Sequence, residues 1–163
     1  GNSREQLYTW LADRNFTITS DGDFIAYKGV NQDLTSVHAG AGIVDGVPTT
    51  GHLPNKVGSI LEMPRGDVNA NPYDGCSYGL HAGTWEYAST FAPVIVKVKI
   101  NPRDVVSVPR DCGFQKLRTC RYEVLEIIDN PDWSALVGND GQEPDNDWDE
   151  NDTWDYLGWY EQG

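Results

Sequence analysis

The sequence predicts an α+β domain: a small, mostly antiparallel sheet with two or three short helices, long loops and an acidic, aromatic C-terminal arm. Residues 94–100 place apolar side chains at alternate positions with Lys97 and Lys99 between them, the pattern of a half-buried strand. Residues 3–13 instead show the spacing of a helix. The length of 163 residues suits one domain. We therefore assign residues 1–130 to the body and residues 131–163 to the arm.

Two helices have clear start signals. Ser3 can cap a first helix, with Gln6 three residues on, and the helix buries one face made by Leu7, Trp10 and Leu11. Thr84 can cap a second, shorter helix over residues 85–91, and Pro93 stops it.

The predicted strands are separated by turn-forming residues such as Gly22, Pro64 and Pro131. Residues 31–60 are rich in Gly, Thr, Asp and Asn, which indicates loops with short strands. The segments expected to be strands include 24–30, 59–63, 94–100, 104–108 and 116–128, and a further strand is expected around Leu80 and His81.

The net charge of −13 comes entirely from the end of the chain. Residues 1–121 contain 12 acidic and 12 basic side chains, whereas residues 122–163 contain 13 acidic ones and no Lys or Arg. A nucleic-acid-binding protein needs a basic face, so direct binding to duplex nucleic acid is disfavoured and a protein partner with a basic surface is expected. Three cysteines, an odd number at irregular spacing, suit a reducing cytoplasm.

The arm combines an acidic run over residues 139–153 with a cluster of aromatic side chains. Such a segment suits an arm that docks on a partner or on another subunit, because aromatic residues dominate interface hot spots. The residues assigned to partner binding are Trp148, Trp154, Tyr156, Trp159 and Tyr160.

The chemistry-bearing residues of the body form no complete motif. His81 follows Leu80 on an expected strand, where a structural role competes with a catalytic or ligand role. The spacing of Cys76, His81, Cys112 and Cys120 does not match a zinc site, and neither a P-loop nor a dinucleotide-binding fingerprint is present. We therefore predict no metal and no cofactor. Small buried cysteines are the simpler interpretation.

The densest basic cluster lies just before and within the last strand. It consists of Lys116, Arg118 and Arg121. A solvated strand end explains it most simply. The alternative is a pocket for an anionic ligand or for the acidic arm.

Ordered blocks of residues give the chain a family resemblance from about Leu7 to Leu125. The blocks are Leu7–Leu11, Ile18–Lys28, Met63–Arg65 with Val68, Cys76–His81 with Tyr87-Ala88, Lys99–Pro102, Asp104–Pro109 and Cys120–Val124. In these blocks the chain resembles the rIIB-like proteins of tailed bacteriophages. The segment after Asn130 lies outside the resemblance.

The resemblance implies a phage accessory protein linked to lysis timing or to resistance against host exclusion. It implies action by protein–protein contact in the host cytoplasm, with peripheral membrane association through a companion protein. It supplies no catalytic residues to carry over. Self-association is a further expectation.

Two other functions compete with this interpretation, although the sequence favours a protein that is not an enzyme. The layout of the chain resembles ADP-ribosyltransferase-like folds that use NAD, with His81, Tyr87 and Glu123 as the analogous residues. This hypothesis requires the three side chains to converge on one cleft. The other alternative is a virion or assembly component whose arm latches a neighbouring subunit.

Overall fold

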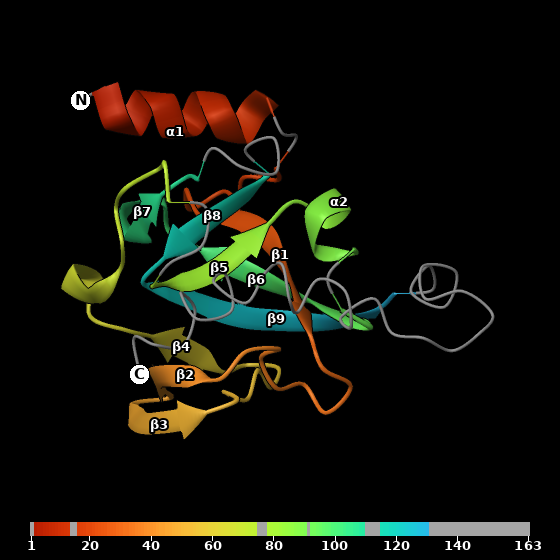
Figure 1. Ribbon diagram of the computed structural model, residues 1–163. Coiled ribbons are helices and arrows are strands. Elements are labelled where there is room, and N and C mark those ends of the chain that lie inside the picture. Colours follow the sequence, from red (N-terminus) through yellow and green to blue (C-terminus); the bar gives the residue numbers. More distant parts are fainter. Residues whose placement is uncertain (1, 14–15, 75–77, 91, 110–114, 131–163) are drawn as a thin grey trace.

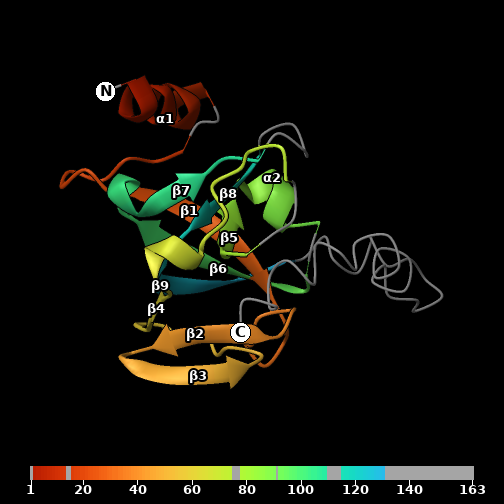
Figure 2. The ribbon, with the colours of Figure 1, turned by 60° about the vertical axis from the view of Figure 1, so that its left-hand side comes forward.

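The computed structural model describes residues 2–13, 16–74, 78–90, 92–109 and 115–130. The described residues form one antiparallel sheet of nine strands with two α-helices against it (Figures 1 and 2). In chain order the elements are α1 (Asn2–Asp13), β1 (Phe24–Val30), β2 (Gly40–Val44), β3 (Val47–Gly51), β4 (Ile60–Glu62), the 3₁₀ helix η1 (Arg65–Asp67), β5 (Leu80–Gly83), α2 (Trp85–Ala88), β6 (Val94–Ile100), the 3₁₀ helix η2 (Pro102–Asp104), β7 (Val105–Ser107), β8 (Lys116–Thr119) and β9 (Arg121–Asp129).

The predicted α+β class with a small sheet is wrong, because the fold is mainly β. Part of this larger sheet comes from residues 40–51, within the segment expected to hold loops with short strands, where β2 and β3 form a hairpin. Its turn is Asp45-Gly46, and both residues have positive φ, 50° and 83°. Two successive positive φ values match the right-handed twist of a hairpin, and Asp-Gly is a sequence typical of this turn. Composition predicted short strands in this region but not their bounds or their pairing.

Individual elements were predicted more accurately than the class. Strands β1 and β6 have the expected bounds, and β4 lies within the expected segment 59–63. The Thr84 side chain caps α2 by accepting a hydrogen bond from the Tyr87 N–H at 3.1 Å. The expected strand 116–128 is present but is divided at Cys120 into β8 and β9.

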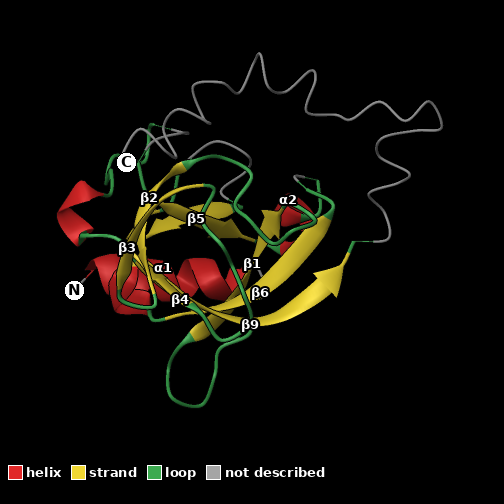
Figure 3. Cartoon of the chain, turned by 90° about the horizontal axis from the view of Figure 1, so that it is seen from below, coloured by secondary structure: helices red, strands yellow, loops and turns green. Residues whose placement is uncertain are grey.

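The division at Cys120 shapes the whole sheet. The strand order is β3-β2-β4-β9-β6-β1-β5-β8-β7, so β8 and β9 are four places apart although one residue joins them. A strand that bends sharply can belong to both sides of a strongly coiled sheet. The Cys120 N–H donates to Asp104 O (2.9 Å), and Cys120 O accepts from the Met63 N–H (3.0 Å), which holds the bend. The sheet therefore curls round a central core (Figure 3).

Alternate residues of the central strands fill that core. Ile100, Val98 and Val96 of β6 face inward, and their partners on β1 and β9 share that face. Helix α1 adds Leu11, which is fully buried, and Trp10, whose ring stacks on Phe16 with centroids 5.0 Å apart. Neither described helix is long and apolar enough to cross a lipid bilayer.

Helix α2 covers the outer face of the sheet near β1. Trp85 packs edge-on against Tyr27, with ring centroids 5.5 Å apart. The Asn130 amide at the end of β9 donates to Ser89 O (2.7 Å) and Ala92 O (3.0 Å). These contacts fasten the helix and its following turn to the last strand.

Gly83 of β5 gives a test of this close packing. A Cβ at this position would collide with the backbone oxygen of Gln115 and lie 3.1 Å from the Tyr87 ring. We expect Gly83→Ala to lower the free energy of unfolding by about 3 kcal/mol, measured by urea denaturation. Gly66→Ala is the matched control, since nothing lies within 4 Å of its added Cβ. Equal stability of the two variants would contradict the packing described here.

Candidate functional site

The side chains of His81, Lys116 and Arg118 lie together on the outer face of the sheet. His81 pairs directly with Arg118, and Gly83 pairs with Lys116, so the three side chains share one face of the β5–β8 pair. Leu80, Ala82 and Leu117 of the same strands face the core. His81 and Lys116 are each 1% exposed and Arg118 is 0% exposed. This group, which we call the outer cluster, is therefore sealed from solvent.

Arg118 is held by main-chain carbonyl groups of one loop. Its Nε donates to Asn69 O at 2.8 Å, Nη1 donates to Asp74 O at 2.6 Å, and Nη2 donates to Asn71 O at 2.6 Å. Nη2 also donates to the hydroxyl of Ser107 on β7 at 3.2 Å. A buried guanidinium needs such partners, because each unsatisfied donor would add a desolvation cost. Four hydrogen bonds from the guanidinium are thus made to the protein itself.

The loop around Arg118, residues 69–74, also has its own internal hydrogen bonds. The Asn69 amide donates to the Asp74 carboxylate (2.8 Å), and the Asn71 side chain accepts from the Tyr73 N–H (3.0 Å). Tyr73 is 74% exposed at the tip of this loop. Arg118 therefore fixes the path of a surface loop rather than presenting its charge to solvent.

Tyr87 lies beside the outer cluster, next to Lys116. Lys116 Nζ lies 5.8 Å from the centre of the Tyr87 ring, a cation–π contact. Burial, and then the charges of Lys116, Lys28 and Arg118, hold the pKa of His81 well below its usual value. His81 is therefore neutral at physiological pH.

Glu123 does not join His81 and Tyr87. It lies on β9, three strands away from β5 in the sheet order, a lateral separation of about 14 Å at normal strand spacing. Its carboxylate instead pairs with Lys99 of the adjacent strand at 3.6 Å. His81 and Tyr87 therefore both lie near Lys116, whereas Glu123, the third residue that the NAD-dependent hypothesis requires, lies elsewhere in the sheet.

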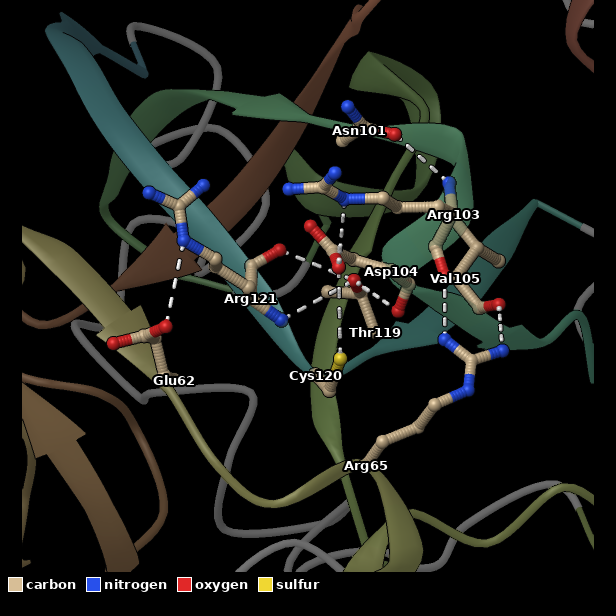
Figure 4. Close-up of polar contacts among 9 residues, drawn as sticks. All are labelled: Glu62, Arg65, Asn101, Arg103, Asp104, Val105, Thr119, Cys120 and Arg121. Atoms are coloured by element: carbon tan, nitrogen blue, oxygen red, sulfur yellow. Dashed lines mark hydrogen bonds and ion pairs between the residues drawn. The ribbon is translucent and has the colours of Figure 1, made fainter.

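The three cations of the predicted basic cluster make two separate sets of contacts. Lys116 and Arg118 belong to the outer cluster, whereas Arg121 lies beyond the bend and pairs with Glu62 of β4 at 3.5 Å (Figure 4). Arg121 is partly exposed and Arg118 is not. The anionic-ligand hypothesis therefore lacks a single convergent site.

A second polar group, which we call the inner cluster, lies on the core side of β1. Lys28 is 4% exposed, and its Nζ donates to His81 O at 2.9 Å while lying 5.8 Å from the centre of the Tyr122 ring. The Tyr122 hydroxyl donates to the Asn55 side-chain oxygen. Burial, the charge of Lys28 and then that of His52 lower the pKa of His38 to about 3.

Sequence reasoning did not identify the inner cluster as a group, although one signal was present. Lys28 alternates with Phe24, Ala26 and Val30, so the period of β1 places it on the apolar face. Asn55 lies in a Gly- and Pro-rich stretch with no distinguishing pattern. Its partnership with Tyr122 spans 67 residues and only the fold reveals it.

Cys120 is buried at the bend and sits beside Asp104. Burial raises the pKa of its thiol, and the Asp104 carboxylate adds to that effect, so it is a poor nucleophile. Among the described residues no group of three or more His, Cys, Asp or Glu side chains could hold a metal ion. Cys76 and Cys112 lie outside the described residues, as do the proposed partner-binding residues Trp148, Trp154, Tyr156, Trp159 and Tyr160.

Comparison with known proteins gives two concordant matches. The family described as bacteriophage T4 protein rIIB matches residues 2–141. Protein rIIB of Enterobacteria phage T4 is 36% identical over 126 residues, which cover 76% of this chain and 37% of that protein. The chain thus spans well under half the length of this relative. No solved structure matches the chain significantly.

The family match includes every described residue and continues past Asn130 to residue 141. The blocks that carry the resemblance end near Leu125, so the family match extends further along the chain than expected. Most of the acidic and aromatic arm still lies beyond the matched region.

Replacement of Arg118 tests the role of the outer cluster. Arg118→Lys keeps the charge but cannot reach three loop carbonyl groups and Ser107 together, so we expect a loss of about 3 kcal/mol in unfolding free energy. Limited proteolysis should then cleave residues 69–74 first. Arg121→Lys is the control and should cost under about 1 kcal/mol, because its pair with Glu62 is partly exposed. Similar effects of both replacements would refute the assignment.

The two buried histidines predict acid sensitivity. Folding lowers the pKa of His38 and of His81, so the unfolded chain binds the extra protons as the pH falls below about 6.5. Stability should be complete above that pH and fall below it, by about 1.4 kcal/mol per pH unit for each histidine. Urea denaturation between pH 7.5 and 5, where carboxylates stay ionised, measures this slope. A His38→Asn, His81→Asn double variant with an unchanged slope would contradict it.

Proposed function

The chain belongs to the family of bacteriophage T4 protein rIIB, and on this premise we propose that it is a phage accessory protein that acts by protein–protein contact in the infected cell. The observation that carries the proposal is the family match over residues 2–141. The process it serves is the timing of host lysis or resistance to host exclusion of the phage. Its place of action is the host cytoplasm, with any membrane association indirect and through a companion protein.

The contacts of the charged residues support contact rather than catalysis. Arg118 of the outer cluster donates to main-chain carbonyl groups of the loop at residues 69–74. Glu123 pairs with Lys99 and lies three strands away from the strand of His81. A catalytic site needs convergent groups that a substrate can reach. His81, Lys116 and Arg118 are instead buried inside the fold. These placements favour a body that serves as a scaffold for binding surfaces.

The partner we propose is a protein with a basic surface. Ten of the chain's 25 acidic side chains lie in residues 131–163, together with the aromatic residues assigned to binding, and this segment has no Lys or Arg. Carboxylates attract such a surface at long range, and buried aromatic rings then supply most of the contact energy. Each contribution can be removed separately.

The test uses the phage that encodes the chain. A stop codon early in the gene should shift the time of lysis or reduce phage yield in an excluding host, and the full chain supplied in trans should restore both. Unchanged lysis time and yield would contradict the proposed function. An assay of NAD hydrolysis with purified protein distinguishes the enzymatic alternative, and for it we expect no turnover.

Two arm variants test how the partner binds. In one, Trp154, Trp159 and Tyr160 become Ala with all charges kept; in the other, the acidic residues of 139–153 become their amides with all aromatic rings kept. We expect both to reduce cross-linking to the partner in infected cells, and only the charge-neutral variant to lose the salt dependence of binding. Truncation after Asn139 should abolish cross-linking. Full cross-linking by the truncated chain would move the binding site to the body.

A further inference from the structure

The sheet has exposed strand edges, and the structure treats them differently. At one end, Arg65 covers the edge of β7, because its guanidinium donates to Arg103 O and Val105 O (Figure 4). At the other end, the edge strand β3 contains Pro48, which has no N–H to offer. Blocking of this kind prevents unwanted strand pairing.

A third edge, along the second half of β9, has neither a covering side chain nor a proline. Strand β4 pairs with β9 only from Arg121 to Glu123, and one further pair of bonds joins Val124 to Gly58 and Ser59. Beyond Val124 no described residue bonds the backbone of β9 on that side. In Figure 3 the arrowhead half of β9 lies at the periphery of the molecule, with β6 on its inner side.

The register determines which backbone groups of this half are open. Val124 directs its N–H and C=O away from β6, toward Ser59 and Gly58. Val124 pairs with Val98 of β6. The register then shifts by one residue at a β-bulge, and Val96, two positions from Val98 on β6, pairs with Ile127. Alternate pairs of an antiparallel ladder have the same geometry, so Ile127 directs its N–H and C=O outward like Val124. By the same alternation Asp129 also does so.

The side chains along this edge are apolar and acidic. Ile127 is 42% exposed, and Val57, next to the Gly58 contact, is 55% exposed. Asp129 is exposed and adds negative charge, whereas Glu126, with 55% of its side chain exposed, is paired with Lys97 of β6 at 3.4 Å. The chain then continues from Asn130 into residues 131–163, with ten more acidic side chains and no basic one.

We propose that the open edge of β9, residues Leu125–Asp129, binds an extended segment of a partner protein that carries basic and apolar residues and adds to the sheet as a further strand. Main-chain bonds to Ile127 and Asp129 give the affinity, as in other cases of strand addition, and an apolar side chain of the partner packs on Ile127 and Val57. A second copy of this chain carries the same net charge of −13, and the repulsion between two such chains disfavours it. This inference rests on the proposed function and names the surface and the partner chemistry that it uses.

The experiment measures binding of designed peptides to the full chain. The probe is a seven-residue peptide of alternating Lys and Val, and the comparison peptide carries Glu in place of Lys. We expect the Lys peptide to bind, with slower hydrogen exchange at the amides of Ile127 and Asp129, and the Glu peptide not to bind. Raising the salt concentration should weaken the binding. Binding without protection of these two amides, or equal binding of both peptides, would overturn the proposal.

One replacement removes the open donor without removing a bond of the sheet. Ile127→Pro deletes an outward N–H and no bond to β6, although it also fixes the backbone φ angle, so we expect binding about tenfold weaker. Ile127→Ala is the matched control, because it truncates the side chain and keeps the donor. Thermal unfolding and the exchange rates of β6 amides verify that both variants fold. If Ile127→Pro binds as tightly as Ile127→Ala, the strand-addition geometry is wrong.

The outcomes also separate this inference from the proposed function. Loss of peptide binding in Ile127→Pro, together with an altered lysis time for phage carrying that variant, supports both. Failure of the peptide to bind overturns the edge site alone if the stop-codon phage still shows its lysis or yield defect. A peptide-induced dimer of the chain, detected by analytical ultracentrifugation, would assign the edge to self-association instead and would also overturn the proposal.

Discussion

The bend at Cys120 is the constraint on which the rest of the structure depends. One continuous segment supplies β8 at one side of the sheet and β9 at the other, so the strands between them must curl round the core. The bend is held by main-chain bonds to Asp104 and Met63, which come from two distant loops. Thr119 adds its hydroxyl, which donates to Asp104 O at 2.8 Å. Closure of the core, burial of Tyr122 and the position of Arg118 all follow from this arrangement.

The curled sheet buries cations on both of its faces, and main-chain carbonyl groups offset the desolvation cost of these charges. Lys28 on the inner face bonds His81 O, and Arg118 on the outer face bonds three loop carbonyl oxygens. Main-chain dipoles stabilise a buried cation without adding a second charge that must also be desolvated. Both cations lower the pKa of His81, which lies between them.

The sequence contained the strands but not their assembly. The alternation in β1 and β6 and the cap at Thr84 depend on neighbours within a few residues, so local pattern was sufficient there. The class was missed because the hairpin at Asp45-Gly46 and the pairing of β5 with β8 rest on turn geometry and on contacts about 35 residues apart. His81 and Arg118 were identified as separate candidates, and only the register made them direct partners. The Tyr122–Asn55 contact had no local signal at all.

The treatment of the sheet edges connects this fold to a binding role. An exposed strand edge can pair with a strand of another chain. Arg65 covers the edge of β7, and Pro48 blocks the edge of β3, so both edges are protected against such pairing. The second half of β9 has neither device, although a bulge and two acidic side chains lie on it. The net charge of −13 repels a second copy and attracts a basic strand, which favours one kind of partner. The open edge of β9 is the feature of the fold that supports the proposed role in protein–protein contact, and it lies at the point where the acidic end of the chain begins.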